Sequence, residues 1–217
     1  FKRLDRISNS LNQDLEIMIR FTPGIECHTH EYIRTGSFDS KFGFGIEYLS
    51  VLFEKIKNTR HLKLDGLHAH IGSQIFELDP HKDLGEIMVN VILDAKKSGH
   101  DIRKLNLGGG LGIKYTEKDD PPSIDEWVKT ISTSVVKACE KNNIDLPTLI
   151  CEPGRSIVST AGITIYKIGA FKKIPGIRTY LSVDGGMSDN PRPITYQSNY
   201  SACLVNNPFN IDSKNKY

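Results

Sequence analysis

Short apolar runs alternate with helical patterns along most of the chain. Four runs that are rich in apolar residues and bounded by turn or polar residues predict buried strands. These runs are Leu15–Phe21, Leu64–Ile71, Ile102–Leu107 and Pro147–Cys151. Segments with helical periodicity separate them, an order that is typical of βαβ units and a parallel sheet.

The helical segments carry start and stop signals. In Leu49–Ile56, apolar residues recur at i, i+3, i+4 and i+7, which predicts an amphipathic helix. A longer helix is expected between Asp79, a candidate N-cap, and Gly99, which suits a helix stop. Ser123 and Glu126 match a capping box and therefore predict the start of a further helix.

The arrangement of these elements favours part of a (β/α)8 barrel. Four β/α units do not close a barrel, and a doubly wound α/β sheet is the competing architecture. Polar or glycine-rich clusters nevertheless fall where predicted strands end, in His70–Gln74, Gly108–Gly112 and Glu152–Arg155. Barrel enzymes collect their active-site residues at this end of the strands, so we expect a site there.

The character of the sequence changes after residue 158. Gly162–Phe171 and Arg178–Val183 are rich in β-branched and aromatic residues, and no helical pattern separates them. We therefore expect residues 1–158 to form a partial (β/α)8 barrel and residues 159–217 to begin an antiparallel β domain.

Composition and charge exclude several classes of protein. The chain has 28 Lys and Arg against 26 Asp and Glu, a formal net charge of +2, so electrostatics do not favour nucleic-acid or membrane-surface binding. No stretch approaches the roughly 18 consecutive apolar residues that span a bilayer. The four cysteines form no C-x-x-C pair, which favours a protein of a reducing compartment, the cytoplasm or a plastid stroma.

Glycines dominate the cluster after the third predicted strand. Gly108–Gly112 contains four glycines in five residues. Glycines let backbone N–H groups approach an anion that side chains would block, which favours a phosphate site. The dinucleotide fingerprint would open a helix here, whereas a proline-containing loop follows, so that interpretation fits badly. The alternative is a tight strand-to-loop turn.

Charged residues offer two further binding clusters. Glu152 and Arg155 could form a structural ion pair. Beside a phosphate loop, however, Arg155 could bind phosphate or carboxylate while Glu152 holds a heterocyclic nitrogen protonated. Arg192 and Tyr196, four residues apart after a turn-rich segment, either face a carboxylate or lie on the surface.

The histidines suit either stacking or metal binding. His68 and His70 share one face of a strand because strand side chains alternate. Together with Cys27, His28 and His30 they match no standard zinc spacing, so we expect no metal. His70, nearer the strand end, could stack on a flat cofactor ring, whereas His68 is expected to be a core histidine.

Ordered motifs along nearly the whole chain resemble one enzyme family. The motifs are Arg20–Gly24, Thr35-Gly36, Ser40–Gly43, His70–Gln74, Gly108–Ile113, Glu152–Arg155 and Asp184–Tyr196. Together they resemble the diaminopimelate decarboxylases, alanine-racemase-like enzymes that use pyridoxal 5'-phosphate (PLP). The resemblance implies a PLP-binding (β/α)8 barrel with a C-terminal β domain, and decarboxylation of meso-2,6-diaminopimelate to L-lysine and CO2.

The resemblance also implies roles for individual residues. His70, stacked on the pyridine ring, and Glu152, paired with its nitrogen, would be the catalytic residues of this chain. The phosphate would be held by Ser73, Gly108, Gly109, Gly110, Gly154 and Arg155. The substrate would be bound by Arg155, Arg192 and Tyr196, and Arg20 is expected near the cofactor. PLP acts as an electron sink when an amino acid loses CO2, which suits these roles.

By the same resemblance, two functional elements fall outside the sequence. The Schiff-base lysine of the family would precede Phe1, and a Cys-Glu-Ser-Gly-Asp segment that completes a partner subunit's site would follow Tyr217. Lys41 belongs to another motif and is not a candidate for that lysine. We therefore expect a piece of a longer homodimeric enzyme that is inactive alone. Two alternatives are an ornithine, arginine or carboxynorspermidine type of decarboxylase, and a non-catalytic PLP-binding regulatory homologue.

Overall fold

The chain divides into two compact units. The computed structural model describes residues 1–25 and 40–208. The first unit contains Phe1–Ile113 and Asp120–Ser159, and the second contains Lys114–Asp119 and Thr160–Tyr217. The second unit therefore includes a short loop that follows the glycine cluster in sequence.

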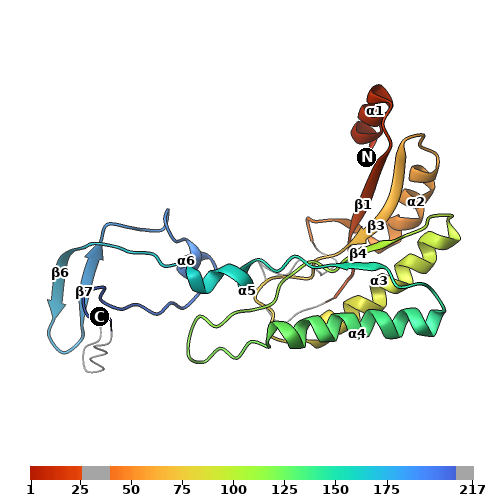
Figure 1. Cartoon of the computed structure of the whole chain (residues 1–217). Coiled ribbons are helices and arrows are strands. Elements are labelled where there is room, and N and C mark those ends of the chain that lie inside the picture. The colour runs from red at the N-terminus through yellow and green to blue at the C-terminus, as the bar shows by residue number, and fades with distance from the viewer. Residues whose placement is uncertain (26–39, 209–217) are drawn as a thin grey trace. The chain divides into compact units, whose positions relative to one another are not determined.

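A five-stranded parallel sheet forms the centre of the first unit (Figure 1). Its order is β2-β1-β3-β4-β5. The strands are β1 (Leu15–Thr22), β2 (Phe44–Gly45), β3 (Leu62–His68), β4 (Lys104–Asn106) and β5 (Thr148–Ile150). The four predicted strands are confirmed, with shifted ends, and the two-residue β2 was not predicted. From β1 to β5 the longer strands neighbour one another in chain order, as in a barrel wall, whereas a doubly wound sheet reverses its order.

Helices connect these strands as the sequence predicted. The first unit contains α1 (Lys2–Leu11), α2 (Leu49–Lys57), α3 (Asp79–Lys97), α4 (Ile124–Asn142) and α5 (Arg155–Val158), with a 3-10 turn at Ile46–Tyr48. A second 3-10 turn, Ser159–Ala161, follows α5. The capping box is confirmed, because the Ser123 side chain accepts from the Glu126 N–H and the Glu126 side chain accepts from the Ser123 N–H. The expected Asp79 cap is wrong: Asp79 is the first residue of α3, and Leu78 precedes it without a side-chain cap.

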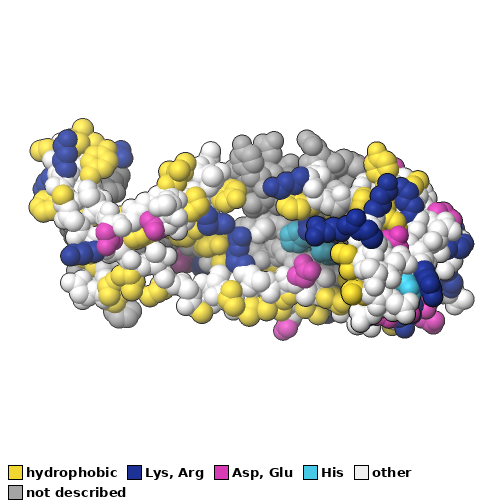
Figure 2. Space-filling view, turned by 90° about the horizontal axis from the view of Figure 1, so that it is seen from above, with side chains coloured by type: hydrophobic (Ala, Val, Ile, Leu, Met, Phe, Trp, Pro, Cys, Tyr) yellow, Lys and Arg dark blue, Asp and Glu magenta, His cyan; other side chains and the backbone are white. Residues whose placement is uncertain are grey.

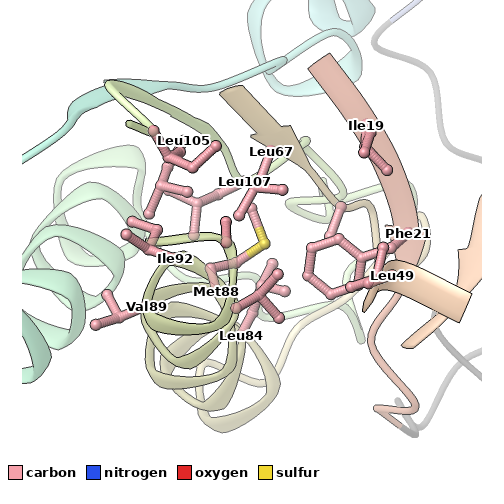
Figure 3. Packing of buried hydrophobic residues seen from close by; sticks show 14 of the residues in the cluster. Ile19, Phe21, Leu49, Leu67, Leu84, Met88, Val89, Ile92, Leu105 and Leu107 are labelled. Atoms are coloured by element: carbon pink, nitrogen blue, oxygen red, sulfur yellow. The ribbon is translucent and has the colours of Figure 1, made fainter. Parts of the chain in front are cut away.

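The hydrophobic core lies between one face of the sheet and the helices (Figure 3). Leu67 of β3 and Leu105 of β4 are completely buried, as are Leu84 and Met88 of α3. Because strand side chains alternate, this packing leaves every second residue of the strands on the opposite face. The packing of the core therefore determines which strand residues lie on the opposite face of the sheet.

That opposite face is polar where the strands end. Arg20 pairs with His68, His68 pairs with Asn106, and Asn106 pairs with Ile150, so these residues form one row across four strands. We call Arg20, His68 and Asn106 the polar row. Figure 2 shows histidine side chains beside Lys or Arg side chains on the first unit. The predicted residues His70 and Gly108 follow His68 and Asn106 of this row by two positions, and Glu152 follows Ile150, the partner of Asn106, by two.

The second unit contains a β-hairpin and a short helix. Strand β6 (Ile168–Ile174) pairs antiparallel with β7 (Arg178–Val183), and α6 spans Arg192–Thr195. The antiparallel β structure agrees with the prediction, although β6 begins six residues after the expected start at Gly162. In the parts of the chain that the structure describes, no helix has the length and apolar character needed to cross a membrane.

Candidate active site

A cavity of about 280 Å³ lies where β3, β4 and β5 end. Its lining residues come from the segments that follow these three strands, including the first residues of α5. They are His70, Ser73, Gly110, Leu111, Glu152, Gly154, Arg155 and Ser156. The structure thus brings together six of the residues predicted to bind a cofactor, which in sequence extend from His70 to Arg155. The other two, Gly108 and Gly109, form the turn that leads to Gly110.

Glycines allow the loops after β4 and β5 to approach each other closely. A Cβ atom on Gly109 would overlap the carbonyl oxygen of Glu152. The backbone N–H of Glu152 also donates to the Gly108 carbonyl at 2.7 Å. Gly108 has φ +67°, a left-handed conformation that favours glycine. The glycine cluster is therefore a close-packed turn, and it also lines the cavity through Gly110.

His70 is held against this turn as a neutral imidazole. Its Nδ1 atom accepts the backbone N–H of Gly109 at 3.2 Å, which places the remaining ring proton on Nε2. Burial lowers the pKa of His70 from its ordinary value, and the positive charge of Arg20 adds to this shift. A neutral, oriented imidazole on the cavity wall suits contact with a flat aromatic ring.

Glu152 presents its carboxylate from the end of β5. The Oε1 atom accepts a hydrogen bond from Asn106 Nδ2 at 2.8 Å, and Oε2 lies 3.6 Å from His68 Nε2. Burial is the main reason that the pKa of His68 is lowered, with Arg20 acting in the same direction and Glu152 against it. The Glu152 side chain remains 49% exposed, so it can meet a ligand in the cavity.

Gln74, which had no predicted role of its own, orients Arg155. The guanidinium Nη1 donates to Gln74 Oε1 at 3.0 Å. The Gln74 amide also donates from Nε2 to the carbonyl of Ile113 at 2.7 Å. Gln74 thus connects the loop after β3 with the loop after the glycine turn and directs a positive charge at the cavity wall.

The family comparison agrees with this assembly. A family described as pyridoxal-dependent decarboxylase, pyridoxal binding domain, matches residues 1–159. The chain belongs to the pyridoxal-dependent decarboxylases. Its cofactor is therefore pyridoxal phosphate, as the motifs implied, and the match covers the described strands and helices of the first unit.

Similar proteins within this group are diaminopimelate decarboxylases. The chain is 56% identical to the enzyme of Synechocystis sp. over 94% of its own length and 43% of that protein. It is 41% identical to the Staphylococcus aureus enzyme, covering 94% of itself and 48% of the relative. The chain thus spans about half the length of the curated relatives it matches.

Solved structures show the same relationship. Diaminopimelate decarboxylase from Helicobacter pylori, complexed with L-lysine, superimposes with a TM-score of 0.83 at 30% identity. That match covers 94% of this chain and 49% of the other. An arginine decarboxylase from Paramecium bursaria Chlorella virus has a TM-score of 0.69 at 17% identity, which shows a shared fold alone.

The cavity of this pyridoxal-dependent family member fits a flat ring that carries a phosphate. The glycine turn lies close to the strand ends, and it has no side chains that would keep a phosphate away from its backbone N–H groups. Arg155 supplies a positive charge at the same cavity. Ser156, which had no predicted role, has a buried Oγ without a hydrogen-bond partner among the described residues and lines the same cavity. A bound phosphate would supply acceptors for such a hydroxyl.

Of the three predicted substrate residues, Arg155 lines the cavity of the first unit, whereas Arg192 and Tyr196 lie together in the second unit. The guanidinium of Arg192 lies 5.3 Å from the ring centre of Tyr196 and 5.6 Å from that of Tyr115. Its Nη2 atom also lies 3.5 Å from Ser198 Oγ. Tyr115 was not singled out from the sequence, although it follows the glycine cluster by only a few residues. Cation–π contacts with two rings restrict the orientation of Arg192.

The sequence analysis expected no metal site at its Cys and His residues. In residues 1–25 and 40–208, no group of three or more His, Cys, Asp or Glu side chains is arranged to hold a metal ion. Cys27, His28 and His30, together with Thr35-Gly36, lie outside the described residues.

Proposed function

We propose that the protein containing this chain is a diaminopimelate decarboxylase that converts meso-2,6-diaminopimelate to L-lysine and CO2. The convergence of the three strand-end loops on one cavity supports a cofactor site. The similarity to diaminopimelate decarboxylases of several bacteria supports this substrate.

The residues of the cavity would each have a separate task. Arg155, Ser73, Gly154 and the Gly108–Gly110 turn would hold the phosphate, and His70 would contact the pyridine ring. Glu152 would accept the N–H of the pyridine nitrogen and so keep that proton in place. When bound, PLP supplies an electron sink for the carbanion that remains after loss of CO2.

We further propose that Arg192 and Tyr196 bind the substrate, with Arg155 contributing a positive charge. Diaminopimelate has a carboxylate at each end, and only one of them is lost. An arginine can recognise the retained carboxylate through two parallel hydrogen bonds. The ring contacts of Arg192 support this role because they orient its guanidinium. The Nε atom of Arg192 is buried and has no hydrogen-bond partner among the described residues.

The barrel of this enzyme would include residues 1–158, and its C-terminal β domain would begin with residues 159–217. We expect the enzyme to be a homodimer in the cytoplasm or a plastid stroma. We expect the chain alone to be inactive. Its sheet has five parallel strands, whereas a closed barrel of this kind has eight. Among the described residues, the two edge strands of this open sheet then leave backbone groups unpaired.

The test uses the full-length protein loaded with PLP. Incubation with meso-diaminopimelate should release lysine and CO2 in equal amounts, whereas ornithine and arginine should give little product. Preferred turnover of ornithine or arginine would contradict the substrate, and PLP binding without any decarboxylation would favour a non-catalytic homologue. Absence of PLP binding would contradict the proposed site itself.

A further inference from the structure

Asn106 is buried at the end of β4 and joins two parts of the candidate site. Only 8% of the residue is exposed. Its Oδ1 atom accepts the backbone N–H of Gly108 at 2.9 Å, and its Nδ2 atom donates to Glu152 Oε1 at 2.8 Å. One side-chain amide therefore touches both the glycine turn and the carboxylate at the end of β5.

The two contacts determine how the Asn106 amide is oriented. The oxygen and nitrogen of a side-chain amide could exchange places by a flip. The Gly108 N–H can only donate, so the amide oxygen has to face it. The NH2 group must then face Glu152, which accepts. The backbone of the glycine turn thus fixes a hydrogen-bond donor against one oxygen of Glu152.

Little else among the described residues restrains this carboxylate. His68 Nε2 lies 3.6 Å from Oε2, beyond ordinary hydrogen-bond distance, and burial lowers the pKa of His68, which disfavours the charged ring. Glu152 is also 49% exposed and follows the last residue of β5 by two positions. Without a fixed donor, its side chain could adopt several rotamers.

We propose that Asn106 is a positioning residue of the cofactor site, which holds the Glu152 carboxylate and the Gly108 turn in one fixed arrangement. This inference rests on the proposed PLP site and extends it. The hydrogen bond from Asn106 leaves Oε2 and the second lone pair of Oε1 for a ligand in the cavity. Asn106 would thereby link the part of the site that holds the phosphate to the part that meets the pyridine nitrogen.

The test compares three variants of the full-length protein. Asn106→Asp has nearly the same size and keeps an acceptor for the Gly108 N–H, but it places an oxygen against Glu152 instead of a donor. Asn106→Ala removes both contacts. Asn142→Asp is the matched control, because Asn142 donates from Nδ2 to the Ala138 carbonyl at the end of α4, and neither residue lines the cavity.

We expect Asn106→Asp to weaken PLP binding and to lower kcat by about tenfold or more, as expected for loss of a hydrogen bond to a charged group. The absorption spectrum of the bound cofactor should change, whereas KM should change less than kcat. The Tm of the cofactor-free protein should fall less for Asn106→Asp than for Asn106→Ala, because the turn contact remains, although the new carboxylate faces Glu152. Asn142→Asp should leave the spectrum and PLP affinity unchanged.

A purely structural role for Asn106 predicts a different pattern. Asn106→Asp would then retain the wild-type spectrum, PLP affinity and kcat, and this result would overturn the inference. If Asn106→Ala fails to fold, Asn106→Asp still tests the positioning role of Asn106. A wild-type protein that binds PLP but does not act on diaminopimelate would contradict the proposed substrate alone. The PLP spectrum and PLP affinity of the variants would still test the role of Asn106.

Discussion

Gly109 and Gly154 lie in neighbouring parts of the site but lack a side chain for different reasons. A Cβ on Gly109 would overlap the backbone of Glu152, whereas a Cβ on Gly154 would meet no atom within 4 Å. Gly154 also has φ −98°, which any residue can adopt. The first glycine is therefore required by packing of the chain, and the second only leaves space in the cavity.

Alanine substitutions should separate these two effects. Gly109→Ala should lower the free energy of unfolding by about 1–3 kcal/mol, because overlap with a backbone atom forces the strand ends apart. Gly154→Ala should leave stability unchanged but weaken PLP binding, because the new methyl group occupies cavity space. Chemical unfolding and PLP titration of the full-length variants measure the two quantities. Equal stability losses in both variants would contradict this distinction.

Sequence patterns predicted the residues of the cavity better than the contacts between them. The motifs predicted that His70 and Glu152 belong to one site, and both line the cavity. The supporting contacts of Asn106 and Gln74 were missed. Asn106 is a polar residue at the end of an apolar run, which is a detectable signal, but its partner lies 46 positions away and only the fold identifies it.

At the scale of elements, periodicity predicted the longer helices and strands because each buries one regular face. The two-residue β2 has no period to detect, and its register is set by pairing with β1. The Asp79 cap failed because α3 begins with Asp79 itself, so that its side chain cannot cap the helix from outside. The capping box of α4 succeeded because it is specified within four residues.

Strand β3 also contains a buried charge that apolar periodicity does not explain. The Asp65 side chain is 2% exposed and lies 2.6 Å from both Arg103 Nη2 and Lys104 Nζ. Hydrogen bonding to Lys104 is the main reason that the pKa of Asp65 lies below its ordinary value, with Arg103 adding to the effect against burial. These contacts join β3 to the start of β4.

Asp65→Asn should destabilise the protein by about 1–3 kcal/mol at neutral pH, because a buried hydrogen-bonded charge is lost. Glu16→Gln is the matched control, since Glu16 contacts the same two basic residues but is 51% exposed. That change should cost less than about 1 kcal/mol. Chemical unfolding of the full-length variants measures both, and equal costs would contradict a special role for burial.

The stability that Asp65 contributes should also depend on pH. Its pKa is lower in the folded protein than in the unfolded chain, so the unfolded chain binds the proton first as the pH falls. The contribution is therefore complete above the unfolded pKa of about 4 and is lost as the pH falls through the folded pKa. The difference in unfolding free energy between wild type and Asp65→Asn should shrink over this acidic range.

At the scale of the whole molecule, the proposed roles divide between the two units. All proposed PLP-binding residues lie in the first unit, including Arg155, which is also proposed to meet the substrate, whereas Arg192 and Tyr196 lie in the second. Substitution of Arg192 or Tyr196 should therefore change substrate binding without changing PLP binding. The second unit also supplies an internal comparison, because the guanidinium of Arg178 lies 5.9 Å from the ring centre of Tyr180 in the β6–β7 hairpin.

Arg192→Ala should raise KM for meso-diaminopimelate by about tenfold or more while the absorption spectrum of bound PLP stays unchanged, because a charged hydrogen bond to a carboxylate is worth about 1.5–3 kcal/mol. Arg178→Ala removes a comparable arginine–tyrosine contact from the same unit and should leave KM unchanged. A general loss of the second unit's structure would affect KM in both variants. If Arg192→Ala altered the PLP spectrum instead of KM, Arg192 would act on the cofactor and not on the substrate.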